Sequence, residues 1–181
     1  MMDEPFLEKV SYRINKQNII VDAFNDWNKA ATAGRAGVLT DLQNVIGKKL
    51  FLYLQDDTTR MYYSTIFQKC RLLQKSHLLE YRCDSPTHMR FMKMEVIPYP
   101  NNDIVFNNYL IREEPFSYRV NIHVSQNTVG TEFNVRCSIC NRLKLDGNDE
   151  WVSPESMAKE KEQNIFVIHS VCLDCQKRIR R

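Results

Sequence analysis

The chain has 181 residues, of which 43% are hydrophobic and 26% are charged, a composition typical of one folded domain or of a domain with a small appendage. This size excludes a large multidomain enzyme, because single hydrophobic cores hold roughly 100 to 200 residues. The net charge of +3 is too small to indicate a nucleic-acid or membrane partner by itself.

The N-terminal ten residues lack the basic start and apolar stretch of a secretory signal, and no apolar run approaches the ~20 residues that cross a bilayer. We therefore expect a cytoplasmic protein that has no membrane partner. Thiols are kept reduced in the cytosol, so the six cysteines are interpreted first as metal ligands or core residues.

A hairpin and a helix are predicted at the start of the chain. Two β-prone runs, 11–14 and 19–23, flank four polar residues, which is typical of a hairpin with a short connection. Asn25 or Asp26 can then cap a helix that continues through Ala33.

Two further helices follow. Thr40 can cap a short helix that stops at Gly47, and the pair Asp56-Asp57 can cap a longer one. The apolar residues after this pair recur at helical spacing and predict one buried face of about four turns. They are Tyr63, Ile66, Phe67, Cys70 and Leu73.

Three strand patterns complete the first part, near residues 79–83, 88–99 and 104–112. Met92, Met94 and Val96 are expected to share one face of the second. Residues 113–117 are interpreted as a linker. The order of elements predicts an α+β fold in which one antiparallel sheet of five strands is combined with a central helical insert.

This order resembles a PAS domain, a small sensor fold in which a five-stranded sheet and central helices enclose a pocket. The resemblance covers about residues 7–115 and is carried by four segments. These are Phe24-Asn25-Asp26-Trp27, Val45-Ile46-Gly47-Lys48 with Leu50-Phe51, Asp56-Asp57-Thr58-Thr59-Arg60, and the last three strands. It implies a protein partner or a small-molecule ligand at this domain, and two copies that can pair as a homodimer.

The resemblance also guides the expectation about cofactors. Haem-binding relatives present an axial histidine from the long helix, whereas residues 57–75 contain none. Flavin-binding light sensors carry a reactive cysteine near the place that Leu50 occupies here. We therefore expect no haem and no flavin, and we interpret Cys70 as a small apolar core residue.

Four cysteines in the second part form two C-x-x-C pairs, Cys137 with Cys140 and Cys172 with Cys175. Each pair can wrap a tight turn, so that four thiolates converge on one tetrahedral ion. The sequence therefore predicts one metal ion per chain, zinc in preference to iron, which could use the same two pairs. We divide the chain into a PAS-like domain, 1–115, and a zinc-binding tail, 116–181.

The segment between the pairs is predicted to fold around this site. It contains a turn within 143–149, a helix start at Ser153-Pro154 and a strand at 165–168. The whole resembles a zinc-ribbon-like tail found behind some bacterial PAS domains, in which a histidine and a small residue precede the second pair, here His169-Ser170. We expect the ring N–H of His169 to donate a hydrogen bond to a ligand sulfur or to a carbonyl, and the alternative is that His169 replaces one thiolate as a ligand.

The sequence contains no recognisable catalytic motif, because its five glycines are scattered and form no phosphate-binding loop. The leading interpretation is a non-enzymatic sensor or adapter in signal transduction. Three alternatives remain: a zinc-thiolate redox switch, a nucleic-acid-binding zinc-ribbon regulator, and an enzyme without a recognisable motif. The second would use the basic end of the chain, Lys177, Arg178, Arg180 and Arg181.

Overall fold

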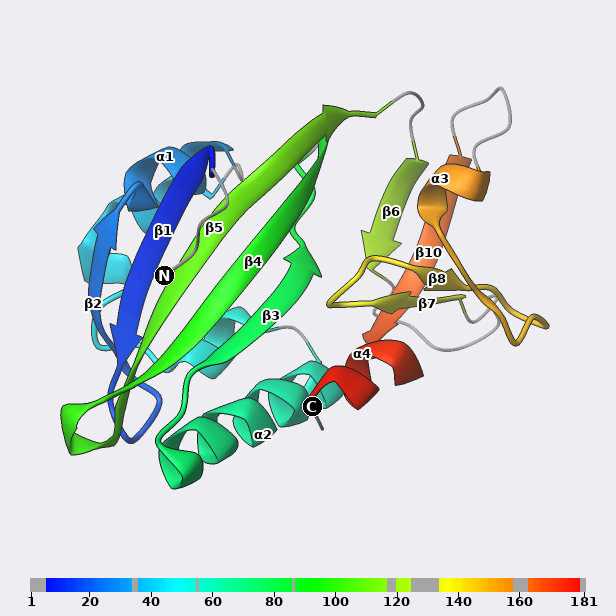
Figure 1. Ribbon diagram of the computed structural model, residues 1–181. Coiled ribbons are helices and arrows are strands. Elements are labelled where there is room, and N and C mark those ends of the chain that lie inside the picture. Colours follow the sequence, from blue (N-terminus) through cyan, green and yellow to red (C-terminus); the bar gives the residue numbers. More distant parts are fainter. Residues whose placement is uncertain are drawn as a thin grey trace. The chain divides into compact units, whose positions relative to one another are not determined.

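The computed structural model describes residues 6–33, 36–54, 56–85, 87–116, 120–124, 134–157 and 163–179 (Figure 1). The chain divides into two compact units. Unit 1 comprises Met1–Leu54 and Tyr63–Pro115, and unit 2 comprises Gln55–Tyr62 and Phe116–Arg181. That 1–115 and 116–181 fold as separate domains stays a prediction.

Unit 1 contains a five-stranded antiparallel sheet, in the order β2-β1-β5-β4-β3 (Figure 1). Its strands are β1 Glu8–Ile14, β2 Ile20–Asn25, β3 His77–Arg82, β4 His88–Tyr99 and β5 Asp103–Pro115. The mixed α+β class with a five-stranded antiparallel sheet is thus confirmed.

The segment between β2 and β3 is helical, as predicted for a central insert. It contains α1 Trp27–Ala33, three 3₁₀ turns at Gly37–Thr40, Leu42–Asn44 and Leu50–Tyr53, and α2 Asp57–Leu73. A further 3₁₀ turn, Pro100–Asn102, joins β4 to β5.

The polar connection of the predicted hairpin is organised by one side chain. Oδ1 of Asn15 accepts hydrogen bonds from the backbone N–H groups of Gln17 at 2.9 Å and of Ile19 at 3.0 Å. This arrangement is an Asx turn, which asparagine favours because its short side chain can replace a backbone acceptor. The flanking strands β1 and β2 pair antiparallel, with Tyr12 opposite Ala23.

The core of unit 1 lies on the sheet face that carries the predicted methionine stripe. Met92, Met94 and Val96 are all buried, whereas Lys93 and Glu95, which alternate with them, are only half-buried, as the alternation requires. The ring of Phe67 in α2 meets that of Phe106 in β5 edge-on, with centroids 5.3 Å apart. Strand alternation and helical periodicity therefore bury their apolar faces in one core.

Capping was predicted correctly at α2 but not at the preceding turns. Oδ1 of Asp56 accepts from the backbone N–H of Thr59 at 2.8 Å. The helix predicted from Thr40 is wrong, because the Thr40 hydroxyl donates backward to the carbonyl of Gly37 at 2.6 Å. Asp41 instead caps the turn that follows, through the N–H of Gln43.

Two other predictions fail near the ends of elements. The linker predicted at 113–117 is wrong for its first three residues, because β5 continues to Pro115. There Glu113 lies opposite Arg90 of β4 and pairs with its guanidinium at 3.4 Å. Leu73 is 48% exposed rather than buried, because α2 ends there and Gln74 takes a positive φ of 50°.

Unit 2 contains a second five-stranded sheet, in the order β6-β10-β7-β8-β9. Its elements are β6 Val120–Val124, β7 Asn134–Cys137, β8 Leu143–Lys144, β9 Trp151–Val152, α3 Pro154–Met157, β10 Gln163–Ser170 and α4 Leu173–Arg178. β10 pairs in parallel with both β6 and β7. The predicted helix start at Pro154 and the strand through 165–168 are confirmed.

A small apolar cluster supports this second sheet. Leu143, Ile165 and Val167 are buried together, and Ile122 and Val152 pack against them.

In the part of the chain that the structure describes, no helix is long and apolar enough to cross a bilayer.

Candidate metal centre

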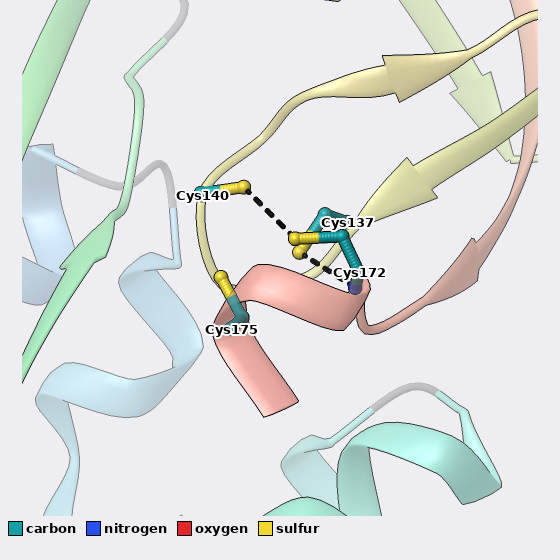
Figure 2. Close-up of side chains that lie close together, drawn as sticks. All are labelled: Cys137, Cys140, Cys172 and Cys175. Atoms are coloured by element: carbon teal, nitrogen blue, oxygen red, sulfur yellow. Dashed lines mark hydrogen bonds between the residues drawn. The ribbon is translucent and has the colours of Figure 1, made fainter. Parts of the chain in front are cut away.

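The first cysteine pair lies on a tight turn at the end of β7. The carbonyl of Cys137 accepts from the N–H of Asn141 at 2.9 Å, and the N–H of Cys137 donates to the carbonyl of Arg142 at 2.8 Å. Asn141 has a positive φ of 61°, a conformation that asparagine tolerates better than most residues. The turn therefore bends the chain back so that the thiols of Cys137 and Cys140 face the same space (Figure 2).

The second pair lies where β10 passes into α4. Cys172 directly precedes this helix, and its carbonyl accepts the N–H of Gln176 at 3.0 Å. Cys175 therefore lies on the first helical turn, with its thiol directed toward the other three (Figure 2). A backbone hydrogen bond from Ser138 to the carbonyl of Ser170, at 2.8 Å, fixes the first turn against the end of β10.

The structure brings the four predicted ligands together. The Sγ atoms of Cys137, Cys140, Cys172 and Cys175 all lie within 4.8 Å of one another. Four sulfur atoms at ~2.3 Å from a tetrahedral zinc ion are separated by about 3.8 Å. The Sγ atoms of Cys140 and Cys172 are 3.7 Å apart, which fits such a shell.

The cluster is sheltered from solvent on most sides. Cys137, Cys172 and Cys175 are buried, whereas Cys140 is partly exposed. Ile139 and Val171, next to ligands in the sequence, are buried as well. All six cysteines belong to the described residues, and none of them forms a disulfide.

Arg142 provides a positive charge at this cluster. Its Nε donates to Sγ of Cys140 and one of its Nη atoms donates to Sγ of Cys172, both at 3.4 Å. The same Nη pairs with a carboxylate oxygen of Asp174 at 2.7 Å. One side chain thus contacts a sulfur atom from each pair.

Hydrogen bonds among the thiols of Cys137, Cys140 and Cys175 shift their pKa values in opposite directions. Hydrogen bonds with the Cys137 and Cys175 thiols, assisted by Arg142, lower the pKa of Cys140. Hydrogen bonding to Cys140 raises the pKa of Cys137 to about 11, and hydrogen bonds to Cys137 and Cys140 raise that of Cys175. Of these three thiols, Cys140 therefore loses its proton most readily, and a metal cation would favour the ionised form of Cys137 and Cys175 as well.

His169 does not take the position expected for it. Within the described part of the chain, its ring forms no hydrogen bond to a ligand sulfur or to a carbonyl, and it is not among the clustered metal-ligating groups. Burial is the main cause that lowers the pKa of His169, and the positive charge of Arg136 lowers this pKa further. Arg142, which sequence reasoning missed, contacts the sulfur atoms instead, and Asp174, also missed, pairs with its guanidinium.

A sequence signal for these two residues does exist. Arg142 follows Cys140 by two positions, and Asp174 follows Cys172 by two positions. Arg142 thus lies just beyond the first pair, whereas Asp174 lies inside the second pair. Opposite charges next to the two pairs are expected to meet once the pairs converge. At the basic end of the chain, Lys177 and Arg178 lie exposed on α4, and Arg180 and Arg181 lie outside the described residues.

Comparison with known proteins gives no match to any family model and no match to any curated protein.

Proposed function

We propose that this chain is a non-enzymatic sensor or adapter in signal transduction. In this proposal, residues 1–115 form a PAS domain that binds a small-molecule ligand or a protein partner. Residues 116–181 form a tail held together by one structural zinc ion on Cys137, Cys140, Cys172 and Cys175. The observation that carries the zinc site is the convergence of four Sγ atoms within 4.8 Å.

A structural role for the ion follows from the donor set. Four cysteine ligands close a tetrahedral shell, whereas a catalytic zinc keeps one position open for water or substrate. Three of the four thiols are buried, so a reacting molecule would have little access to the ion. The short strands of unit 2 and its small apolar cluster also favour a fold that needs a metal, because such cores contribute little stability by themselves.

The sensory role rests on the resemblance to PAS domains. The five-stranded antiparallel sheet with helices between β2 and β3 supports this proposal, because the resemblance implies that arrangement. The α2 sequence contains no histidine, and Leu50 is an unreactive hydrocarbon, so the proposed domain carries neither haem nor flavin.

A redox switch is the second candidate function, favoured by one observation. The Sγ atoms of Cys140 and Cys172 are only 3.7 Å apart, and Cys140 is partly exposed. An oxidant such as hydrogen peroxide would take two electrons from these thiolates, form the S–S bond and be reduced to water. Zinc would leave as two of its ligands are lost.

Mass spectrometry of the purified full chain under native and denaturing conditions tests the proposal. We expect one zinc ion per chain, no mass corresponding to haem or flavin, and a subunit count that identifies any homodimer. A redox switch predicts in addition that mild peroxide releases zinc and removes two mass units, and that a thiol reductant restores zinc binding. If the protein contains no metal after purification in the presence of zinc, the proposed zinc-binding tail is contradicted.

A further inference from the structure

The Arg142 guanidinium bridges the two cysteine pairs in a way that a simple surface cation would not. Its Nε and one Nη each reach one sulfur from a different pair at 3.4 Å, and the same Nη also donates to a carboxylate oxygen of Asp174 at 2.7 Å. We propose that Arg142 and Asp174 form a clamp that slows metal release and shields the Cys140 thiolate from electrophiles and oxidants. This inference rests on the proposed zinc site and specifies how that site is kept inert.

Charge balance gives the first reason for such a clamp. Four thiolates around a divalent ion leave a net charge of about −2, which an enclosed site must offset. A guanidinium stays positive at every physiological pH and presents several N–H donors in a planar fork. Arg142 therefore supplies permanent positive charge to Cys140 and Cys172 together.

Hydrogen bonding to sulfur gives the second reason. A lone pair that accepts an N–H is less available to attack an electrophile, and the thiolate becomes a weaker nucleophile. Cys140 needs this protection most, because it is the member of the cluster that is not fully buried. Groups that surround metal ligands typically change metal affinity or activity 10–100-fold when they are removed.

Asp174 acts by positioning the arginine. Its side chain is 60% exposed, and exposed ion pairs contribute little stability on their own. Its effect on the site must therefore pass through the orientation of the guanidinium. Replacing Asp174 by asparagine loosens the clamp without altering any group that contacts sulfur.

Zinc release during alkylation measures the clamp directly. Zinc-loaded full-length chains are treated with iodoacetamide, in which a thiolate forms an S–C bond and iodide leaves. A chromogenic chelator follows the released zinc, and peptide mass spectrometry identifies the cysteine that reacts first. We expect Arg142→Gln to release zinc about tenfold faster than wild type, with Cys140 modified first, and Asp174→Asn to fall between them.

Two further variants separate the clamp from general effects. Lys144→Gln removes another ion pair of unit 2, the one with Asp149 at 2.9 Å, and should release zinc at the wild-type rate. Arg142→Lys keeps the charge but not the fork, so it should restore part of the protection. Cobalt in place of zinc adds a spectroscopic readout, because losing N–H donors to sulfur shifts the sulfur-to-cobalt charge-transfer band of Arg142→Gln to lower energy.

The outcomes distinguish the clamp from the zinc site itself. Wild-type protein without bound zinc would defeat the proposed function, whereas zinc-loaded Arg142→Gln with the release rate and cobalt band of wild type would overturn the clamp alone. If Arg142→Gln does not retain zinc, Asp174→Asn decides, because a wild-type release rate in that variant also overturns the clamp.

Discussion

The backbone N–H of Cys172 donates a hydrogen bond to Sγ of Cys137 at 3.4 Å, although the two residues are 35 positions apart in the chain. This hydrogen bond links the backbone of the second cysteine pair to a sulfur atom of the first pair. Backbone N–H donors favour the ionised form of a thiol, which is the form that binds a metal. The fold of the tail and its metal affinity are therefore coupled.

Replacing a ligand should unfold the tail selectively. Cys137→Ser, or removal of the metal with a chelator, is expected to increase hydrogen exchange of the β7 and β10 amides, because folding of a small metal site depends on its ion. The amides of β4 and β5 in unit 1 should keep their protection. Hydrogen exchange read by mass spectrometry of the full chain measures both regions together.

Cys83→Ser is the matched control for this experiment. Cys83 is an exposed cysteine of unit 1 that does not belong to the cluster. Its replacement should leave exchange in β7 and β10 unchanged. Equal protection of these strands in Cys137→Ser and Cys83→Ser would show that the tail folds without its metal ligands.

Three features that depend on residues close together in the sequence were predicted correctly. The spacing of the cysteines, the Asp56 cap and the alternation of Met92 and Met94 each depend on residues a few positions apart, and all three match the structure. The prediction failed at Thr40 because a hydroxyl can bond forward or backward along the chain, and the sequence does not say which.

Features that depend on distant parts of the chain could not be predicted. β6 and β10 pair in parallel although Val120 and Gln163, which face each other, lie in separate segments of the sequence. The contact of Arg142 with Asp174, 32 residues away, was missed for a related reason, because only the convergence of the two cysteine pairs brings these residues together. Glu113 was assigned to a linker because its pairing with Arg90 lies across the sheet.

The core of unit 1 should depend strongly on Phe67. This side chain is 1% exposed, and Phe67→Ala is expected to lower the free energy of unfolding by about 3–5 kcal/mol through lost burial and a residual cavity. Urea unfolding followed by Trp27 fluorescence, in a chain carrying Trp151→Phe, reports on unit 1. Leu72→Ala on the same helix is the control, because Leu72 is 83% exposed and should change stability by less than about 0.5 kcal/mol.

Unit 1 should lose stability in mild acid through His77. Burial, with the nearby positive charge of Lys69, lowers the pKa of His77 below 6.5, and its Nε2 has no hydrogen-bond partner among the described residues. Below pH 6.5, His77 therefore binds a proton more readily in the unfolded chain than in the folded chain. The free energy of unfolding falls as the pH decreases through this range.

The same urea assay, repeated between about pH 7 and pH 5, tests this contribution. Wild type should lose more stability over this range than His77→Gln does, while His88→Gln should lose about as much as wild type because it retains His77. An identical pH dependence in wild type and His77→Gln would contradict the assignment.

Nucleic-acid binding by the tail should be weak. Two of its cations, Arg142 and Lys144, already pair with Asp174 and Asp149, which reduces the charge available to phosphate. Fluorescence anisotropy with labelled duplex and single-stranded oligonucleotides should give micromolar affinity or weaker at physiological salt. Submicromolar binding that disappears in a chain ending at Gln176, with a salt slope of about 0.9 per phosphate contact, would instead support the nucleic-acid alternative.

X-ray absorption at the zinc edge tests the four-thiolate site most directly. The full chain, purified with zinc, should contain one ion per chain surrounded by four sulfur atoms at ~2.3 Å. Cys83→Ser should give the same spectrum, since Cys83 does not belong to the cluster. A shell that includes nitrogen at ~2.0–2.1 Å, which would make His169 a ligand, or a chain that binds no zinc would contradict the account.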